Sequence, residues 1–203
     1  MYKIIKRILD FLVSLFAIIA LSPVIAIAAV AVKADSKGPV FFVQKRVGMD
    51  KKHFNMYKFR SMRTDTPHDM PTHLLNNPDA FITKVGKFLR KSSLDELPQL
   101  FNILKGDMSI VGPRPALWNQ DDLIAERDKY GANNIRPGLT GWAQVNGRDE
   151  LEIDVKAKFD GDYVKKMSLP FDIKCIINTA LQVVKHEGVV EGGTGTLDKT
   201  DKE

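Results

Sequence analysis

FLVSLFAIIALSPVIAIAAVAV, residues 11–32, is the stretch that decides how this 203-residue chain is built, because it contains no charged side chain. About 20 apolar residues are enough to cross the hydrocarbon core of a bilayer as a helix. A soluble helix this long is rarely apolar on every face, and a signal peptide has a shorter apolar region. The stretch therefore predicts association with a membrane.

Ser22 and Pro23 interrupt this stretch near its middle. A proline inside a helix removes one amide hydrogen and clashes with the carbonyl four residues earlier, here that of Ile19. We therefore expect a kink, with the Ser22 hydroxyl available to satisfy a freed backbone group. Each half of the helix would be about 16 Å long at 1.5 Å per residue. One half would cross only about half of a hydrocarbon core of ~30 Å.

Both flanks of the apolar stretch are basic, and positive charge marks the cytoplasmic side of a membrane protein. The flanking residues are Lys3, Lys6 and Arg7 before it and Lys33, Lys37, Lys45 and Arg46 after it. Two positive flanks favour a re-entrant hairpin, a helix–break–helix over residues 1–34 that enters and leaves by the same leaflet. An ordinary kinked anchor that crosses the bilayer remains the alternative.

The remainder of the chain predicts a small, mostly helical domain of the α+β class. Short apolar runs at 40–43 and 53–62, separated by Gly48-Met49-Asp50, predict a β-hairpin. The segment 63–79 is rich in Pro, Asn, Asp and Thr and predicts a mobile loop. Residues 80–91 predict a basic amphipathic helix, either in the lipid headgroup plane or packed as a surface helix. A last helix is expected over 171–188.

SSLDELPQL, residues 92–100, places two acids side by side after the basic residues Lys87, Arg90 and Lys91. Ser93 and Glu96 have the spacing of a capping box, so Ser93 is expected to begin a helix. Asp95 would then lie beside the positive end of the helix dipole, which would keep it ionised. The pair is either a helix start or a catalytic pair, and an ionised carboxylate suits a nucleophile.

Two stiff loops carry arginines that suit a bound anion. In IVGPRPAL, residues 110–117, Arg114 stands between two prolines, which fix the backbone on either side of it. A guanidinium held in this way suits bidentate contact with phosphate. The second loop, residues 135–148, contains further polar side chains among glycines. They are Arg136, Gln144, Asn146 and Arg148.

Composition narrows the ligand class without fixing it. The net charge of +5 and pI of about 9.2 suit a nucleic acid, an anionic membrane or a phosphorylated substrate. A nucleic acid is disfavoured, because the basic residues are not interleaved with aromatic ones. Asp160-Gly161-Asp162 has the spacing of a metal-dependent glycosyltransferase motif, but we expect two acids on a helix surface. The single cysteine, Cys175, is expected in the core.

Longer motifs reveal a resemblance to a known family. YKFRSM, SSLDELPQLFNILKGDMSIVGPRP and RPGLTGWAQVNGR follow the Ser22-Pro23 segment in order. Over about residues 1–188 the chain resembles the bacterial sugar transferases, small monotopic phosphoglycosyl transferases, and most of all those that start capsular polysaccharide synthesis. The resemblance implies transfer of a sugar 1-phosphate from a UDP-sugar to polyprenyl phosphate, usually undecaprenyl phosphate. UMP would be released, and Mg²⁺ would be required.

The resemblance also implies roles for individual residues. Asp95 would attack the β-phosphate, form an aspartyl phospho-sugar intermediate and contact Mg²⁺, while Glu96 would assist in proton handling or positioning. Lys58 and Arg114 would bind phosphate, and Arg90 would support the acid pair. The remaining expected contacts are Asp172 in the site and the nucleotide contacts Arg136, Gln144, Asn146 and Arg148.

These inferences divide the chain into a membrane hairpin at 1–34, a catalytic domain at 35–188 and a disordered tail at 189–203. The catalytic domain is expected on the cytoplasmic face of the bacterial inner membrane, in contact with membrane lipid. An N-acetylated amino sugar is the expected donor sugar, with a plain hexose left open. Possible partners are a second copy of the chain and downstream glycosyltransferases. The alternative function is a non-catalytic membrane-bound scaffold or regulator that binds anionic lipid.

Overall fold

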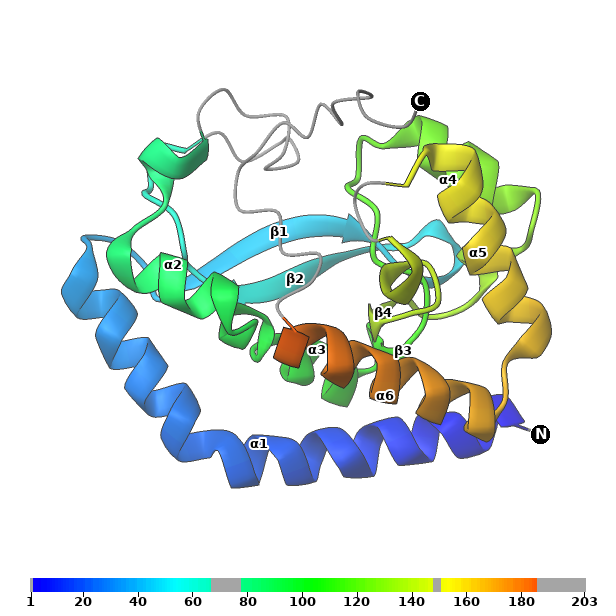
Figure 1. Cartoon of the computed structure of the whole chain (residues 1–203), viewed down its shortest axis with the longest axis horizontal. Helices are drawn as coiled ribbons and strands as arrows, with labels where there is room; N and C mark the ends of the chain where they lie inside the picture. The colour runs from blue at the N-terminus through cyan, green and yellow to red at the C-terminus, as the bar shows by residue number, and fades with distance from the viewer. Residues whose placement is uncertain (1, 67–77, 148–150, 186–203) are drawn as a thin grey trace, which may run out of the picture.

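The computed structural model describes residues 2–66, 78–147 and 151–185. Within these ranges the chain forms helices and two small sheets (Figure 1), which confirms the expected mixture of helix and strand. Most of the loop predicted at 63–79, together with Arg148 and the tail at 189–203, lies outside the described residues. Those predictions stay predictions.

Helix α1, Tyr2–Asp35, is continuous and bends near its middle (Figure 1). Pro23 lies inside it, and the Ser22 hydroxyl donates a hydrogen bond of 2.8 Å to the carbonyl of Ile19. That carbonyl is the one to which Pro23 has no amide hydrogen to donate. The predicted kink and the predicted serine contact are therefore confirmed. The structure differs from the predicted helix–break–helix in one respect, since the backbone forms one bent helix rather than two.

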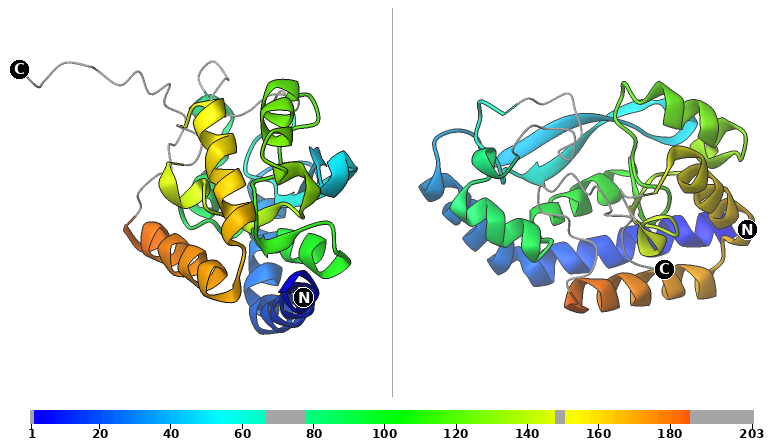
Figure 2. Two further views of the ribbon diagram at one scale, coloured as in Figure 1. Left: turned by 90° about the vertical axis from the view of Figure 1, so that its right-hand side faces the viewer. Right: turned by 45° about the horizontal axis from the view of Figure 1, so that its top comes forward.

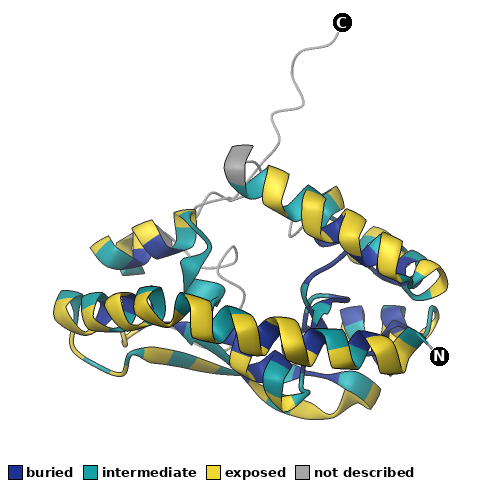
Figure 3. Cartoon of the chain, turned by 90° about the horizontal axis from the view of Figure 1, so that it is seen from below, coloured by how far each residue is buried: buried dark blue, intermediate teal, exposed yellow. Residues whose placement is uncertain are grey.

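One face of α1 packs on the domain and the other is exposed (Figure 3). Most of the exposed face is apolar, with Ile4, Ile5, Ile8, Phe11, Leu12, Phe16, Ile19, Ile27 and Val30. By length and composition α1 could cross a membrane. A helix in the core of a soluble protein would bury these side chains instead. The exposed apolar face therefore fits membrane association.

The strands β1, Phe41–Val47, and β2, His53–Phe59, form an antiparallel hairpin joined by the short 3₁₀ helix η1, Met49–Lys51. Phe41 pairs with Phe59 at one end, and Val47 pairs with His53 at the other. The predicted hairpin and its connection are confirmed. Val47 and Phe59 are also buried, so the hairpin contributes to the core from both ends.

Helix α2, Lys84–Lys91, follows the short 3₁₀ helix η3, Pro78–Phe81. The Thr83 hydroxyl caps α2 by accepting a hydrogen bond of 3.0 Å from the amide of Gly86. Gly86 lets α2 approach the chain after β2, because a β-carbon there would lie 1.9 Å from the carbonyl oxygen of Ser61. The predicted amphipathic helix is present but begins later than residue 80.

The remaining elements complete the domain. They are η4, Leu94–Glu96; α3, Gln99–Lys105; β3, Ser109–Val111; α4, Asp121–Asp128; η5, Ala132–Asn134; β4, Gly138–Thr140; η6, Gln144–Asn146; α5, Ile153–Lys166; and α6, Leu169–Lys185. The strands β3 and β4 are parallel. Figure 2 shows α5 and α6 as the last two helices, with α6 on the same side of the molecule as α1.

The expectation that Asp160 lies on a helix surface is wrong. Asp160 is only 1% exposed and accepts hydrogen bonds from the Arg127 guanidinium, with Nη2 at 2.6 Å and Nε at 2.8 Å. Arg127 is buried as well, so this ion pair joins α4 to α5 in the interior. Cys175 is fully buried, as predicted.

Candidate active site

The two acids lie in η4, a single 3₁₀ turn, rather than in the first turn of an α-helix. The predicted capping box is wrong, because Ser93 has the left-handed backbone φ of 56° and its side chain makes no capping hydrogen bond. Helix α3 begins at Gln99, with Pro98 as its N-cap residue, so both acids precede it, and Gly106 ends α3 as predicted. The dipole of α3 is therefore not what sets the charge of Asp95.

One carboxylate oxygen of Glu96 accepts hydrogen bonds from two cationic side chains. Lys58 Nζ lies 2.8 Å from Glu96 Oε1, and Arg114 Nη2 lies 3.2 Å from the same atom. Lys58 comes from β2, and Arg114 comes from the loop after β3. The structure thus joins three of the residues predicted for the site, although they are far apart in the sequence.

The two acids have different electrostatic environments. Burial pushes the pKa of Glu96 up, but Lys58 and Arg114 outweigh that effect and hold it well below the ordinary value. Burial raises the pKa of Asp95 above its ordinary value, against the nearby charges of Lys58, Arg90 and Arg114, and the charge of Glu96 adds to the rise. Among the described residues, Asp95 makes no hydrogen bond or ion pair. Its oxygens are therefore available to a ligand.

The second predicted loop braces the loop that carries Arg114. The amide of Gly112 donates to the carbonyl of Thr140, and the amide of Gly138 donates to the carbonyl of Pro113, both at 2.8 Å. A β-carbon on Gly138 would lie 2.1 Å from the Gly112 nitrogen, so a side chain there would separate the two loops. This contact explains why the two stiff loops occur together.

The polar side chains of that second loop make local contacts. Arg136 donates through Nε to the carbonyl of Gly106 at 2.9 Å. Gln144 is buried and donates to the carbonyl of Leu139 at 2.9 Å, and Asn146 donates to the carbonyl of Trp142 at 2.6 Å. None of these bonds reaches the acid pair within the described residues. Their predicted contacts with the nucleotide stay predictions.

Asp172 lies in a different cluster from the acid pair. It accepts hydrogen bonds from Tyr2 Oη at 2.6 Å, Lys6 Nζ at 2.7 Å and Tyr163 Oη at 2.7 Å. Lys6 is also 3.8 Å from Asp10. Together, the bonds of Asp172 join the start of α1 to α5 and α6. The structure therefore gives Asp172 the role of an anchor for α1, while its predicted place in the active site stays a prediction.

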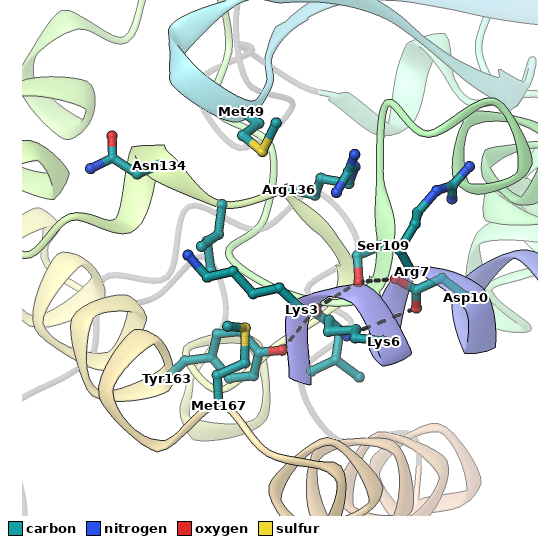
Figure 4. A pocket seen from close by; sticks show the side chains of 12 residues that line it. Lys3, Lys6, Arg7, Asp10, Met49, Ser109, Asn134, Arg136, Tyr163 and Met167 are labelled. Carbon is teal, nitrogen blue, oxygen red and sulfur yellow. Dashed lines mark hydrogen bonds and ion pairs between the residues drawn. The ribbon is translucent and has the colours of Figure 1, made fainter. Parts of the chain in front are cut away.

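The start of α1 holds buried polar contacts that the sequence did not reveal. Figure 4 shows Lys6, Arg7, Asp10, Ser109 and Tyr163 around a pocket at this end of the molecule. Arg7 donates to the carbonyls of Ile103 and Leu104, in the last turn of α3, at 2.6 and 2.9 Å. Asp10 accepts from the Ser109 hydroxyl at 2.7 Å and from the Ile110 amide at 3.1 Å. An acid at the edge of a membrane segment, four residues after a lysine, was the available signal.

The other end of α1 is fixed to the same domain. Arg60, the arginine of YKFRSM, donates to the carbonyls of Ser36 and Lys37, both at 2.7 Å. The Asp35 carboxylate accepts from the amide of Val85, at the start of α2, at 3.0 Å. Both ends of α1 therefore contact one folded domain.

The residue that follows the acid pair packs near both arms of α1. Leu97, the residue after Glu96, packs against the cluster that contains Ala28 and Val32, which follow Pro23. Leu97 also packs against a second cluster. Ile18 and Leu21, which precede Pro23, pack against that same cluster. Leu97 therefore shares an apolar cluster with each arm of α1.

A family model described as bacterial sugar transferase matches residues 1–186. The chain belongs to the bacterial sugar transferase family. This result confirms the resemblance seen in the motifs and covers every described element from α1 to α6.

Curated relatives of this sugar transferase include enzymes with named substrates. The UDP-glucose:undecaprenyl-phosphate glucose-1-phosphate transferase of Xanthomonas campestris pv. campestris is 40% identical over 90% of this chain and 39% of its own length. The UDP-N-acetylgalactosamine-undecaprenyl-phosphate N-acetylgalactosaminephosphotransferase of Aeromonas hydrophila is 40% identical over 88% of this chain and 43% of its own length. The uncharacterized sugar transferase EpsL of Bacillus subtilis (strain 168) is 38% identical over 97% and 95%.

The chain spans about two fifths of the length of the relatives with named substrates. The match to EpsL, by contrast, extends over nearly the full length of both chains. The residues matched by the family model include the acid pair, both stiff loops and α1. The substrates of the longer relatives are therefore only proposed, below, for this sugar transferase.

Proposed function

We propose that this chain transfers a sugar 1-phosphate from a UDP-sugar to undecaprenyl phosphate and releases UMP. The observation that carries the proposal is the acid pair, in which Glu96 binds Lys58 and Arg114 while Asp95 has no partner among the described residues. An accessible carboxylate beside two fixed cations suits attack on a diphosphate. The names of the Xanthomonas and Aeromonas relatives support the same reaction.

The proposed reaction has two steps. A carboxylate oxygen of Asp95 attacks the phosphorus next to the sugar, and the bond from that phosphorus to the bridging oxygen breaks, so that UMP leaves with the electron pair. An oxygen of the lipid phosphate then attacks the same phosphorus, and the bond to Asp95 breaks. Lys58 and Arg114 offset the charge of the diphosphate and of the departing UMP.

Glu96 acts in this scheme by positioning rather than by proton transfer. Its pKa is held below the ordinary value, so at neutral pH it stays ionised and does not pick up a proton. Because Lys58 and Arg114 share one of its oxygens, it keeps two cations from different elements beside Asp95.

The site fits Mg²⁺ only in a form shared with the substrate. Within the described residues, no three His, Cys, Asp or Glu side chains are grouped to hold a metal ion. Mg²⁺ is commonly bound by one or two carboxylates together with substrate phosphates and water. Asp95 supplies such a carboxylate. Bound there, Mg²⁺ would offset the negative charge of the diphosphate.

The proposed topology is re-entrant, with the domain on the cytoplasmic face of the inner membrane. Arg7 and Asp10 fix one end of α1 to the domain, and Asp35 fixes the other, whereas a straight span would place its ends on opposite sides of the bilayer. Helix α6 lies on the same side of the molecule as α1 (Figure 2) and also exposes apolar side chains. They are Leu169, Ile173, Ile176, Ile177 and Leu181.

Thiol labelling in intact cells tests this topology. With the buried Cys175 replaced, single cysteines at Tyr2 and at the exposed Lys52 should both be protected from a membrane-impermeant reagent. Labelling at residue 2 alone would show that α1 crosses the membrane.

The proposed donor carries an N-acetylated amino sugar, and the product begins a capsular or other exopolysaccharide. The N-acetylgalactosamine named for the Aeromonas relative supports this choice, and the glucose named for the Xanthomonas relative is the competing donor. A panel of UDP-sugars separates the two directly.

UMP release by detergent-purified protein, with Mg²⁺ and undecaprenyl phosphate, tests the reaction. We expect release with one donor and none with Asp95→Asn, because an amide cannot replace the attacking carboxylate. Asp121→Asn, at an exposed position on α4, is the matched control and should keep full activity. If folded protein released no UMP with any donor, the result would favour a non-catalytic scaffold that binds anionic lipid.

A further inference from the structure

Helix α2 exposes a face on which an aromatic side chain is surrounded by lysines. Phe88 is 64% exposed, although it is a large apolar residue. Lys84, Lys87 and Lys91 are exposed as well, and they lie four residues before, one before and three after it. Long lysine side chains beside an exposed aromatic ring suit the boundary between lipid chains and headgroups.

The opposite face of α2 connects this patch to the membrane helix and to the acid pair. Val85 and Leu89 pack with the cluster that contains Val32 of α1. Figure 3 shows α2 beside the last turns of α1. Arg90 follows Leu89 on α2, and its positive charge acts on Asp95. One short helix therefore carries lysines on its exposed face and an arginine whose charge acts on the nucleophile.

We propose that the exposed face of α2 is the docking site for the phosphate monoester of the polyprenyl acceptor. This inference rests on the proposed function, and it assigns the second substrate to a place. Lys84, Lys87 and Lys91 receive the phosphate, Phe88 contacts the first part of the polyprenyl chain, and Arg90 lies on the path to Asp95.

Charge favours this ligand over the bulk lipid. A phosphate monoester carries a charge between about −1.5 and −2 at neutral pH, because its second pKa is about 6. A phosphodiester lipid headgroup such as phosphatidylglycerol carries one negative charge. Three clustered lysines therefore attract the acceptor more strongly than the surrounding anionic lipid.

Equilibrium binding tests the docking site without any turnover. Asp95→Asn protein in phosphatidylcholine nanodiscs would be titrated with radiolabelled undecaprenyl phosphate. Adding Lys84→Gln, Lys87→Gln and Lys91→Gln should weaken binding at least about tenfold, because each lysine near a charged surface changes affinity about fivefold. The matched control replaces three exposed lysines outside α2, namely Lys51, Lys52 and Lys129, by Gln and should leave binding unchanged.

Kinetics separate the two substrates. In protein with an intact Asp95, the Lys84, Lys87 and Lys91 variant should form the phospho-sugar adduct from the donor alone at the parental rate, as measured by intact mass. Its half-saturating fraction of undecaprenyl phosphate should rise by the factor found in the binding titration. Failure of the parent protein to form any adduct would refute the covalent reaction and leave the binding titration as the measure of docking.

Three results would overturn the docking site. The first is unchanged acceptor binding in the α2 variant. The second is an equal loss in the control variant, which would reveal an effect of net charge alone. The third is displacement of undecaprenyl phosphate by an equal amount of phosphatidylglycerol, which would make α2 a contact for any anionic lipid.

Discussion

Replacement of Asp172 by Ala tests whether the buried cluster at the start of α1 is an anchor. The carboxylate accepts from Tyr2, Lys6 and Tyr163, and the Lys6 side chain is only 11% exposed. The substitution removes the charge at 2.7 Å from Lys6 and leaves that lysine with the Asp10 carboxylate at 3.8 Å.

The expected cost follows from leaving a buried charge without its closest partner. Removing one member of a buried ion pair costs about 3–5 kcal/mol. Because Asp10 compensates in part, we expect the lower end, about 3 kcal/mol. Tyr163→Phe is the matched control, since it removes one hydrogen bond and keeps the ion pair. It should cost only about 1 kcal/mol.

Trp142 provides the assay, because its ring centroid lies 5.0 Å from that of Phe171, the neighbour of Asp172. Denaturant unfolding in detergent would be followed by its fluorescence after Trp118→Phe. An Asp172→Ala protein within about 0.5 kcal/mol of its parent would refute the anchor. The folded variant should still form the adduct on Asp95; loss of that chemistry without loss of stability would place Asp172 in the active site instead.

Three further predictions concern single groups. Glu96→Gln should lower the rate of adduct formation about 10²-fold, because Lys58 and Arg114 lose the charge that holds them, and a parental single-turnover rate would contradict this. The rate of adduct formation should fall as pH drops through the pKa of Asp95, which burial raises above the ordinary value. Since Glu96 adds to that rise, the acid limb of kcat/KM should move to lower pH in Glu96→Gln, and an unmoved limb would show that the two acids do not interact. Burial raises the pKa of Cys175 to about 11, so iodoacetamide at pH 8 should alkylate it only after denaturation, as read by intact mass.

The parts of the fold that depend on local pattern could be predicted from the sequence. The apolar stretch predicted α1, the proline predicted its bend, and the two short runs predicted the hairpin of β1 and β2. The motif resemblance grouped Lys58, Arg114 and Glu96, which the structure joins through one carboxylate oxygen. These features are set by residues close in sequence or by motifs long enough to compare.

The parts of the fold that depend on contacts between residues distant in sequence could not be predicted. Ser93 and Glu96 have the residue types and spacing of a capping box, but Ser93 adopts a positive φ and α3 starts only at Gln99, so no capping box forms. Lys6 follows the positive-inside pattern, yet its charge is bound by Asp172, 166 residues later in the chain. Periodicity carries no information about such a partner.

The contacts of Leu97 tie the geometry of α1 to that of the acid pair. Leu97 lies two residues after Asp95, and it packs in one apolar cluster with residues that follow Pro23 and in another with residues that precede it. A bilayer whose hydrocarbon thickness differs from the depth of the bend deforms the helix or the lipid, at a modest cost per ångström of mismatch. Any change in the angle between the arms moves Leu97 and with it the nucleophile. We therefore expect the rate of sugar-phosphate transfer to vary with the acyl-chain length of the surrounding lipid, even when the substrates are saturating.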